Sequence, residues 1–155
     1  MKAVIQRVTS SSVKVDGELI GSIGKGYNVL LGVEPEDTTE HADILAAKIS
    51  KLRVFEDENG KMNLSIQDVD GEILAISQFT LCADIKKGNR PSFVSAAPPD
   101  MAKELYEYFQ QQLLKEGVRK VEHGIFGADM KVEINNDGPV TILMDTSLWV
   151  KKNEN

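Results

Sequence analysis

Apolar residues in the first third of the chain follow the two-residue period of β-strands. Residues 3–8 are rich in β-branched side chains, and residues 13–15 alternate before Asp16-Gly17, a dipeptide favoured in tight hairpins. Residues 19–23 fit the returning strand of that hairpin. Residues 28–33 are almost continuously apolar, as expected of a strand that is covered on both faces. The pattern therefore predicts a hairpin followed by a buried central strand.

Two later segments follow the longer period of α-helices. The first helix is expected after Asp37 or Thr38, either of which can cap its N-terminus. Its apolar face, spaced at i, i+4 and i+7, consists of Leu45, Ile49 and Leu52. The second helix is expected to begin near Asp100, after Pro98-Pro99, and to end at Gly117. Its apolar stripe consists of Met101, Leu105, Tyr108 and Phe109.

Further short strands complete the predicted fold. A charged turn, residues 56–61, separates two short strand-like segments. The other predicted strands are residues 72–76, 118–121, 130–134 and 140–144. Many strands with two helices indicate an α+β fold, in which a curved or barrel-like, mostly antiparallel sheet carries two main helices on one side. We expect residues 1–149 to form a single domain and residues 150–155 to form a frayed tail.

Composition narrows the possible classes of protein. The chain has 155 residues, of which 41% are hydrophobic and 27% are charged, as in an ordinary soluble domain with one core. No apolar run approaches the ~20 residues of a membrane span, so no membrane partner is expected. Polar residues break up the N-terminus where a secretory signal would lie, and the single cysteine, Cys82, excludes an internal disulfide. We therefore expect a cytoplasmic protein.

Motifs for metals and cofactors are missing from the sequence. It contains no CxxC or HExxH pattern, so no metal site is predicted. It contains no P-loop and no GxGxxG after a strand, and we expect no cofactor. His41 falls in the first turn of a predicted helix, where a solvated side chain is expected. His123 has no carboxylate at a telling spacing, so the sequence gives no support to a Ser-His-Asp hydrolase.

A polar cluster, Ser77-Gln78-Phe79-Thr80, interrupts the apolar run that begins at Ile73. If these polar side chains are buried, each needs a hydrogen-bond partner. One interpretation is a strand end whose hydroxyl groups bond to neighbouring backbone. The other is a set of donors that orients a carbonyl group or stabilises an oxyanion.

Gly138-Pro139 lies between the last two predicted strands, after three turn-forming residues. Proline cannot donate a ladder hydrogen bond, and the peptide bond before it is the one that readily becomes cis. Glycine leaves its own carbonyl and amide unshielded. The pair is therefore either a plain hairpin turn or a rigid backbone probe. Arg7 poses a similar choice, since it can point to solvent or clamp backbone carbonyls with its guanidinium group.

The loop after the polar cluster is basic, although the formal net charge of the chain is −6. Its three cations are Lys86, Lys87 and Arg90. Such loops are usually just solvated. Their position only a few residues beyond Thr80 makes phosphate contact the sharper interpretation. The net charge argues against indiscriminate nucleic-acid binding but leaves room for this local patch.

Taken together, these segments resemble the D-aminoacyl-tRNA deacylase family in its widespread bacterial and eukaryotic form. The similarity begins at residues 1–8 and covers nearly the whole chain. The two specific motifs are Ser77-Gln78-Phe79-Thr80-Leu81 and Asn136-Asp137-Gly138-Pro139-Val140-Thr141. Matching segments elsewhere are residues 55–57, 61–64, 88–93 and 126–130. Two separate motifs in the right order, joined by matching segments, make a specific signal.

The resemblance implies an enzyme that hydrolyses the ester between a D-amino acid and the 3′ end of tRNA. It implies mischarged glycyl-tRNA as a second substrate class. It also implies a homodimer in which Gly138-Pro139, with a cis bond, enters the partner subunit's active site and rejects L-amino acids. Arg7 is expected to help hold that motif. The residues expected to line the catalytic pocket are Ser77, Gln78, Phe79 and Thr80, with Phe126 at its border. The candidates for tRNA contact are Lys86, Lys87 and Arg90.

Two mechanisms are compatible with the motif. Thr80 could form an acyl-enzyme, but that requires an activating base, and none lies next to it in sequence. We favour assistance by the terminal 2′-hydroxyl of tRNA, with Gln78 and backbone amides stabilising charge. Two other functions stay open: a tRNA-binding or editing module without chemistry of its own, and a small-molecule esterase that uses Ser77 or Thr80 as its nucleophile.

Overall fold

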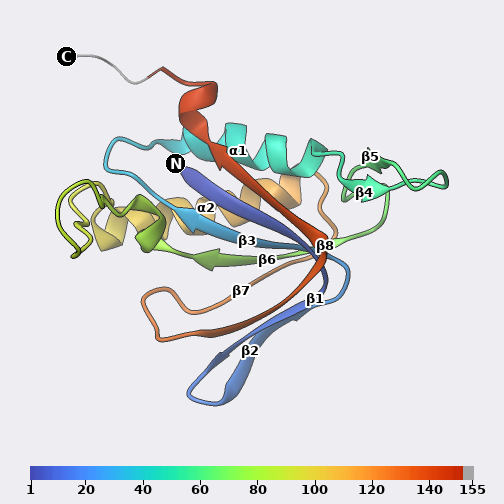
Figure 1. The fold of residues 1–155 in the computed structure, drawn as a ribbon, viewed down its shortest axis with the longest axis horizontal. Coiled ribbons are helices and arrows are strands. Elements are labelled where there is room, and N and C mark those ends of the chain that lie inside the picture. Colours follow the sequence, from blue (N-terminus) through green and yellow to red (C-terminus); the bar gives the residue numbers. More distant parts are fainter. Residues whose placement is uncertain (152–155) are drawn as a thin grey trace.

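One curved sheet organises the molecule, which a computed structural model describes for residues 1–151 (Figure 1). Its strands are β1 (Lys2–Val15), β2 (Glu18–Ile23), β3 (Gly26–Gly32), β6 (Glu72–Ser77), β7 (Val121–His123) and β8 (Lys131–Asp145). The strand order is β2-β1-β3-β6-β7, and β8 pairs with β1 on the side opposite its other partners. β2 also contacts β6 and β7, so the sheet curls into a nearly closed barrel.

The sheet is mixed. β1 pairs antiparallel with β2, β3 and β8, whereas the pairs β3–β6 and β6–β7 are parallel. Parallel neighbours need a long crossover, and the two helices lie in these crossovers. α1 (Thr39–Lys51) lies between β3 and β6, and α2 (Pro99–Lys115) lies between β6 and β7. The α+β fold with a curved sheet and two main helices is confirmed.

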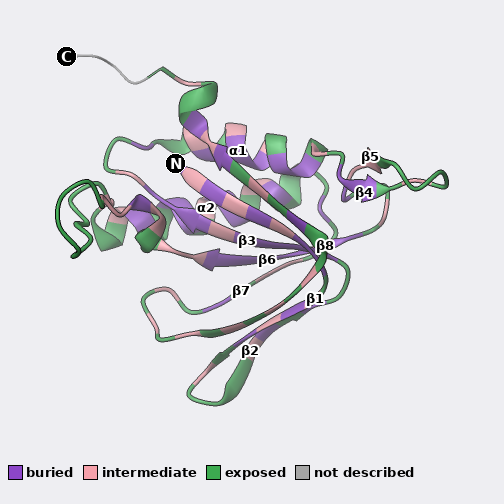
Figure 2. Cartoon of the chain, viewed as in Figure 1, coloured by how far each residue is buried: buried purple, intermediate pink, exposed green. Residues whose placement is uncertain are grey.

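Both helices pack against each other and against the same face of the sheet (Figure 1). Their buried sides face the central strands, and their exposed sides face solvent (Figure 2). The largest core cluster joins Leu45 and Ile49 of α1 and Phe109 of α2 to Ile5 and Tyr27 on the sheet. A second cluster fills the barrel itself and consists of Val8, Val13, Ile23, Leu74 and Ile76. The helix faces predicted from periodicity therefore form the main core.

The helix ends refine the expected boundaries. Thr38 is the N-cap residue of α1, and its N–H donates to Nδ1 of His41 at 3.0 Å. His41 is therefore half-buried in a capping contact, not solvated as expected. At the end of α2, Gly117 has a φ of 102°, and the N–H of Val118 donates to the carbonyl of Leu113 at 3.1 Å. Val118 thus packs over the helix end, and the expected strand at residues 118–121 begins only at Val121.

The prediction of a hairpin around Gly138-Pro139 is wrong. β8 is one strand of 15 residues that pairs with β1 on both sides of this dipeptide. Gln6 pairs with Thr141 and Val8 with Asn136, so residues 137–140 bulge opposite a single residue of β1. A proline can leave a ladder at a bulge as well as at a turn, and β1 is long enough to pair with both halves. The true hairpins are β1–β2, turning at Asp16-Gly17, and β4 (Phe55–Glu56) with β5 (Met62–Leu64).

Within the described part of the chain, no helix combines the length and apolar character needed to cross a bilayer. The predicted tail, residues 150–155, lies mostly outside the described residues. At its start, the N–H of Val150 donates to the carbonyl of Thr146 at 2.8 Å, in continuation of the short 3₁₀ helix η2 (Thr146–Leu148).

Candidate active site

The polar cluster lies where β6 ends. Ser77 is the last residue of the strand, and the chain passes directly into η1, a 3₁₀ helix (Phe79–Cys82). The N–H of Gln78 donates to the carbonyl of Leu31 on β3 at 2.8 Å, and its carbonyl then accepts from Leu81 at 3.2 Å. Because β3 and β6 are parallel, this is the carboxyl end of the pair. Crevices that bind ligands form at such ends in α/β sheets.

A cavity of about 700 Å³ opens at this end of the sheet. Ser77, Gln78 and Phe79 line it from β6 and the turn that follows, and Phe126 lines it from the loop before β8. The other lining residues come from β3, the loop before α2, the start of α2, and residues 127–132. They are Leu31, Val33, Ile76, Phe93, Val94, Ala96, Ala97, Pro98, Pro99, Ala102, Gly127, Ala128, Asp129, Met130 and Val132. Four of the predicted site residues therefore share one cavity.

Thr80 stands apart from this group. Its side chain is exposed and does not line the cavity. Its hydroxyl oxygen accepts a hydrogen bond from the side-chain amide of Gln78. An amide N–H is a donor and cannot take a proton from the hydroxyl group. Among the described residues, Thr80 therefore has a contact that orients Gln78 and none that would activate it as a nucleophile.

The cavity is poor in acids and bases. Among the described residues that line it, only Asp129 is ionisable, and this exposed carboxylate lies 3.3 Å from the ammonium of Lys131. Nearby Cys82 is buried, and burial raises the pKa of its thiol, which disfavours the reactive thiolate. No group of His, Cys, Asp or Glu side chains suited to hold a metal ion occurs in residues 1–151. The chemistry of the cavity must therefore depend on positioning, on neutral hydrogen-bond donors, or on the substrate.

Several lining residues were not among the predicted site residues. Phe93 packs edge-on against Phe79, with ring centroids 4.9 Å apart, although both rings are partly exposed. Ala102 gains its position only because α2 begins at the cavity. Met130 lies in the loop that also carries Phe126. The family-like segments 88–93 and 126–130 were the available signal for Phe93 and Met130, whereas nothing in the sequence marked Ala102.

The second motif lies in the bulge of β8. The Gly138-Pro139 peptide bond is cis, and both residues are exposed. The side chain of Asn136 spans the bulge: its Oδ1 accepts from the N–H of Val140 at 3.1 Å, and its Nδ2 donates to the hydroxyl of Thr141 at 3.0 Å. Asn136 was matched as part of the motif, but this bridging role was not foreseen. The bulge is thus a defined shape closed by one side chain.

Arg7 supports the bulge from beneath. Its side chain is buried, which is the inward one of the two orientations considered. Nε donates to the carbonyl of Asp137 at 3.1 Å, and Nη1 donates to the carbonyl of Val54 at 2.6 Å. A Cβ atom on Gly138 would lie 3.1 Å from Nη2 of Arg7 and 2.9 Å from Val140. Arg7 therefore clamps backbone carbonyls and, together with Val140 and the φ of 129°, makes position 138 unfavourable for residues other than glycine.

The bulge and the cavity lie far apart within one chain. The bulge is opposite Arg7, which pairs with Tyr27 on β3, and Tyr27 pairs with Ile73 on β6. Ser77 lies four residues farther along β6. Four residues along a strand and three spacings between strands correspond to roughly 20 Å. Gly138-Pro139 therefore does not reach the cavity of its own chain.

The basic loop lies beside the cavity. Asp84 and Ser92 exchange two backbone hydrogen bonds of 2.8 and 2.9 Å, which close the loop at its base. The three cations between them, Lys86, Lys87 and Arg90, are all exposed. Phe93, which lines the cavity, follows directly after this closure. The three cations therefore lie on a loop whose base adjoins the cavity.

Comparisons with known proteins decide the family. The family model described as D-Tyr-tRNA(Tyr) deacylase matches residues 4–145. The chain belongs to this family. It is 60% identical over 147 residues to the D-aminoacyl-tRNA deacylase of Clostridium botulinum (strain Alaska E43 / Type E3), covering 95% of this chain and 98% of that protein. It is 56% identical over 146 residues to the protein of the same name from Geotalea daltonii, covering 94% and 97%.

A solved structure extends the comparison to the fold. The deacylase-family chain superposes on the structure described as "c-Myc DNA Unwinding Element Binding Protein" with a TM-score of 0.88 and 49% sequence identity. The match covers 94% of this chain and 98% of that one. The resemblance inferred from the two motifs is confirmed, and so is the deacylase-like fold. The protein is an enzyme of the deacylase family.

Proposed function

We propose that this protein hydrolyses the ester bond of D-aminoacyl-tRNA and releases free tRNA and the D-amino acid. The observation that carries the proposal is the cavity at the end of β6. Ser77, Gln78 and Phe79 of the first family motif line it, and its volume of about 700 Å³ suits a small-molecule-sized group such as an aminoacylated nucleoside. Family membership agrees with this substrate, because the relatives carry the name D-aminoacyl-tRNA deacylase.

Discrimination between enantiomers is assigned to Gly138-Pro139. Both enantiomers carry the same side chain, so the size of a pocket cannot separate them, and rejection needs a clash against one hand. The bulge presents exposed backbone that Arg7 and Asn136 hold in place. A rigid main-chain surface is indifferent to the identity of the side chain that it admits. Such a surface suits an enzyme that accepts many D-amino acids.

We also propose a homodimer, which the separation of the two motifs supports. Each chain carries the bulge roughly 20 Å from its own cavity. The bulge can therefore act only in the cavity of another molecule, and we assign it to that of a partner subunit. Under this arrangement one chain supplies the pocket and the other supplies the filter.

Glycyl-tRNA is the second proposed substrate. A filter that works by a clash with the side chain of the wrong hand has nothing to reject in glycine. Glycine mischarged onto tRNA should therefore be hydrolysed by the same cavity. The proposal predicts that glycyl-tRNA is cleaved while L-alanyl-tRNA, which has one additional methyl group, is not.

For the chemical step we propose assistance by the 2′-hydroxyl of the terminal adenosine. Among the described lining residues no side chain is suited to act as a general base, and the contact of Thr80 is with a donor. The vicinal hydroxyl lies next to the ester in every substrate, so the protein need only position the ester. Gln78 and the first amides of η1, which have no acceptor within the turn, are assigned to the developing charge. A D-aminoacyl-tRNA ending in 2′-deoxyadenosine should bind but turn over at least 100-fold more slowly.

The deciding experiment is a paired hydrolysis assay with D-tyrosyl-tRNA and L-tyrosyl-tRNA, in which release of free tRNA is measured. We expect rapid hydrolysis of the D form and almost none of the L form. Binding of both without hydrolysis would favour a non-catalytic tRNA-binding module. Rapid cleavage of simple esters without tRNA, together with a covalent adduct on Ser77 or Thr80, would favour a small-molecule esterase.

A further inference from the structure

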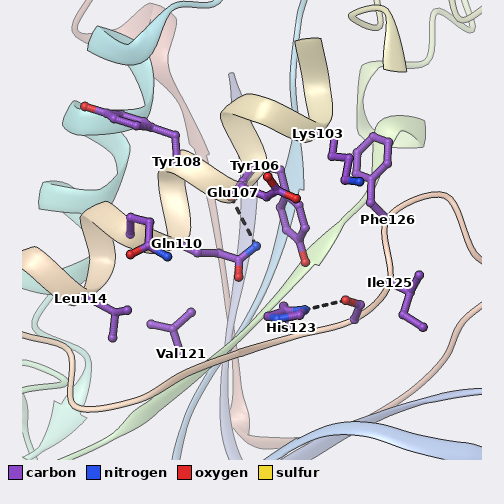
Figure 3. Close-up of a pocket in the computed structure, with 12 residues that line it drawn as sticks. Lys103, Tyr106, Glu107, Tyr108, Gln110, Leu114, Val121, His123, Ile125 and Phe126 are labelled. Atoms are coloured by element: carbon purple, nitrogen blue, oxygen red, sulfur yellow. Dashed lines mark hydrogen bonds between the residues drawn. The ribbon is translucent and has the colours of Figure 1, made fainter. Parts of the chain in front are cut away.

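A second cavity, of about 740 Å³, adjoins the candidate active site (Figure 3). One side of it is formed by α2 and the other by β7 and the loop that follows. The residues that line it are Lys103, Tyr106, Glu107, Tyr108, Gln110, Gln111, Leu114, Val121, His123, Gly124, Ile125 and Phe126. Neither the proposed hydrolysis nor the filter uses this cavity.

The two cavities share a wall. Phe126 lines both of them, and its ring centroid lies 6.1 Å from that of Tyr106. On α2, Ala102 lines the first cavity and Lys103 the second. The two cavities therefore adjoin at Phe126 and at the start of α2. In the proposed substrate, the group that continues from the terminal adenosine is the rest of the single-stranded 3′ end of tRNA.

The lining of the second cavity presents hydrogen-bond acceptors, one on the buried Gln110 and two on the exposed residues Glu107 and His123. Nδ1 of His123 lies 2.7 Å from the carbonyl of Gly124, which can only accept, so this contact favours the tautomer that is protonated at Nδ1 and has Nε2 as an acceptor. Nε2 of Gln110 donates to the carbonyl of Tyr106 at 3.4 Å, which leaves Oε1 of Gln110 as an acceptor on the side of His123 (Figure 3). Glu107 adds a carboxylate. Three acceptors suit a ligand that carries an amino group.

The walls supply flat surfaces and one cation. Tyr106 is fixed, because its buried hydroxyl donates to the carbonyl of Ala75 at 2.6 Å, and burial raises its pKa. Tyr106 is itself buried in the core and supports Phe126, whose partly exposed ring is the kind of platform on which unpaired nucleobases stack. Lys103 lies at the Phe126 end of the cavity (Figure 3), where a strand passing between the cavities would place a phosphate.

We propose that the second cavity binds the nucleotide before the terminal adenosine, and that it selects cytidine there. tRNA ends in cytidine-cytidine-adenosine, and the exocyclic amine of cytosine donates to carboxylate and other acceptor groups. The acceptors are His123, Gln110 and Glu107, and Lys103 contacts the connecting phosphate. The inference rests on the proposed hydrolysis of D-aminoacyl-tRNA, to which it adds a second recognition site on the substrate.

The test compares two D-tyrosyl-tRNAs, one ending in the natural CCA and one ending in CUA. Uracil replaces the amine donor with a carbonyl acceptor, so we expect kcat/KM for the CUA substrate to be about tenfold lower, through KM. His123→Ala should reduce that difference to about twofold. Lys103→Ala should lower kcat/KM about fivefold for both substrates. Lys115→Ala is the matched control on the same helix, outside both cavities, and should change neither value.

Equal kcat/KM for CCA and CUA substrates in the unmodified protein would overturn this inference and leave the proposed hydrolysis intact. A difference between the CCA and CUA substrates that persists unchanged in His123→Ala would also overturn it, because the selection would then lie elsewhere. Failure to prefer D-tyrosyl-tRNA over L-tyrosyl-tRNA with the CCA end would instead overturn the proposed function itself.

Discussion

The end of β6 and the bulge of β8 form opposite kinds of surface. The end of β6 offers space: a cavity of about 700 Å³ lined mainly by apolar side chains and by loops. The bulge offers no space, only exposed backbone around Gly138 over a buried guanidinium group. Binding of a substrate needs the first, and exclusion of a substrate needs the second. Under the proposed function, neither region is sufficient for selective hydrolysis, and a single chain keeps them apart.

The two regions also differ in the contacts that hold them in place. Nε of Arg7 and the side chain of Asn136 bond to the bulge, Nη1 of Arg7 anchors the guanidinium group on Val54, and β1 pairs with β8 on both sides of the bulge. The loop beside the cavity is closed by one bridge, between Asp84 and Ser92, and the N–H of Ala97 anchors its end on Val33 at 2.9 Å. The bulge is therefore held by side chains and strand pairing, whereas the loop is held mainly by backbone hydrogen bonds at its base.

The largest expected effect comes from filling the cavity. Ala102 lies on a helix and lines the cavity, so the indole of Ala102→Trp should occupy the space of the substrate. We expect kcat/KM for D-tyrosyl-tRNA to fall at least 100-fold, while thermal unfolding shows that the fold is kept. Activity within a few-fold of the unmodified protein would show that the cavity is not the substrate site.

The second effect concerns the bulge. Gly138 has a φ of 129°, which other residues rarely adopt, and a Cβ atom there would meet Val140 and Arg7. Gly138→Ala should therefore cost roughly 1–3 kcal/mol in the free energy of unfolding and displace the bulge. We expect the preference for D- over L-tyrosyl-tRNA to fall at least tenfold, measured as the ratio of kcat/KM values.

Gly60 provides a matched control for that variant. Its φ of 72° makes alanine strained there too, but a Cβ atom would have nothing within 4 Å, and the residue lies in the β4–β5 turn. Gly60→Ala should lose about 1 kcal/mol of stability with no change in the preference for D-tyrosyl-tRNA. Equal loss of selectivity in both variants would mean that general destabilisation, and not the bulge, sets the preference.

Mixing the two altered chains tests whether the regions act across subunits. Gly138→Ala chains keep the cavity and lose the filter, whereas Ala102→Trp chains keep the filter and lose the cavity. After unfolding and joint refolding with an excess of Ala102→Trp chains, each open cavity should face an intact bulge. Hydrolysis of L-tyrosyl-tRNA should then fall, while hydrolysis of the D form persists. Selectivity that does not respond to mixing would contradict action in the partner subunit.

A smaller effect is expected at Thr80. Because the structure gives its hydroxyl no base and places it outside the cavity, Thr80→Ala should lower kcat only two- to tenfold. The expected loss reflects a less well oriented Gln78. Single-turnover hydrolysis of D-tyrosyl-tRNA is the measurement. A loss of 1,000-fold or more with binding intact would make Thr80 a nucleophile and give the cavity the chemistry that it otherwise lacks.

The smallest effect per residue is expected on the basic loop. Lys86, Lys87 and Arg90 are exposed, so each should contribute a screened phosphate contact rather than positioning of the ester. Changing any one to alanine should raise KM a few-fold at low salt and reduce the slope of log affinity against log salt by about 1. Lys61→Ala, an exposed lysine in the β4–β5 turn, should leave that slope unchanged.

Sequence periodicity was sufficient for the parts of the fold that are built locally. Leu45 and Ile49 predict the buried face of α1, and Asp16-Gly17 predicts the β1–β2 hairpin, because both signals depend on neighbours in sequence. The continuity of β8 was missed for the opposite reason. Whether Gly138-Pro139 forms a turn or a bulge depends on a distant strand, β1, that is long enough to pair with both halves.

The candidate site shows the same limit. The sequence of residues 77–80 predicts a polar site at a strand end. Only the fold shows that Phe79 lines the cavity and that the exposed Thr80 does not. The orientation of Arg7 was undecided in the sequence because alternation along a strand allows either face. Ala102 could not be found at all, since an alanine on a helix is significant only after that helix is docked over a cavity.

The continuity of β8 bears on how such an enzyme can evolve. Main-chain atoms are the same at every residue, so a filter made of them is insulated from most point substitutions. Outward side chains of β8 away from the bulge, such as the exposed Leu143, can change without altering the surface that the substrate would meet. Gly138 is the exception, because any added atom collides with Val140 and Arg7. Under the proposed function, the selectivity of the enzyme for D- over L-aminoacyl-tRNA would then depend on the codons of very few residues.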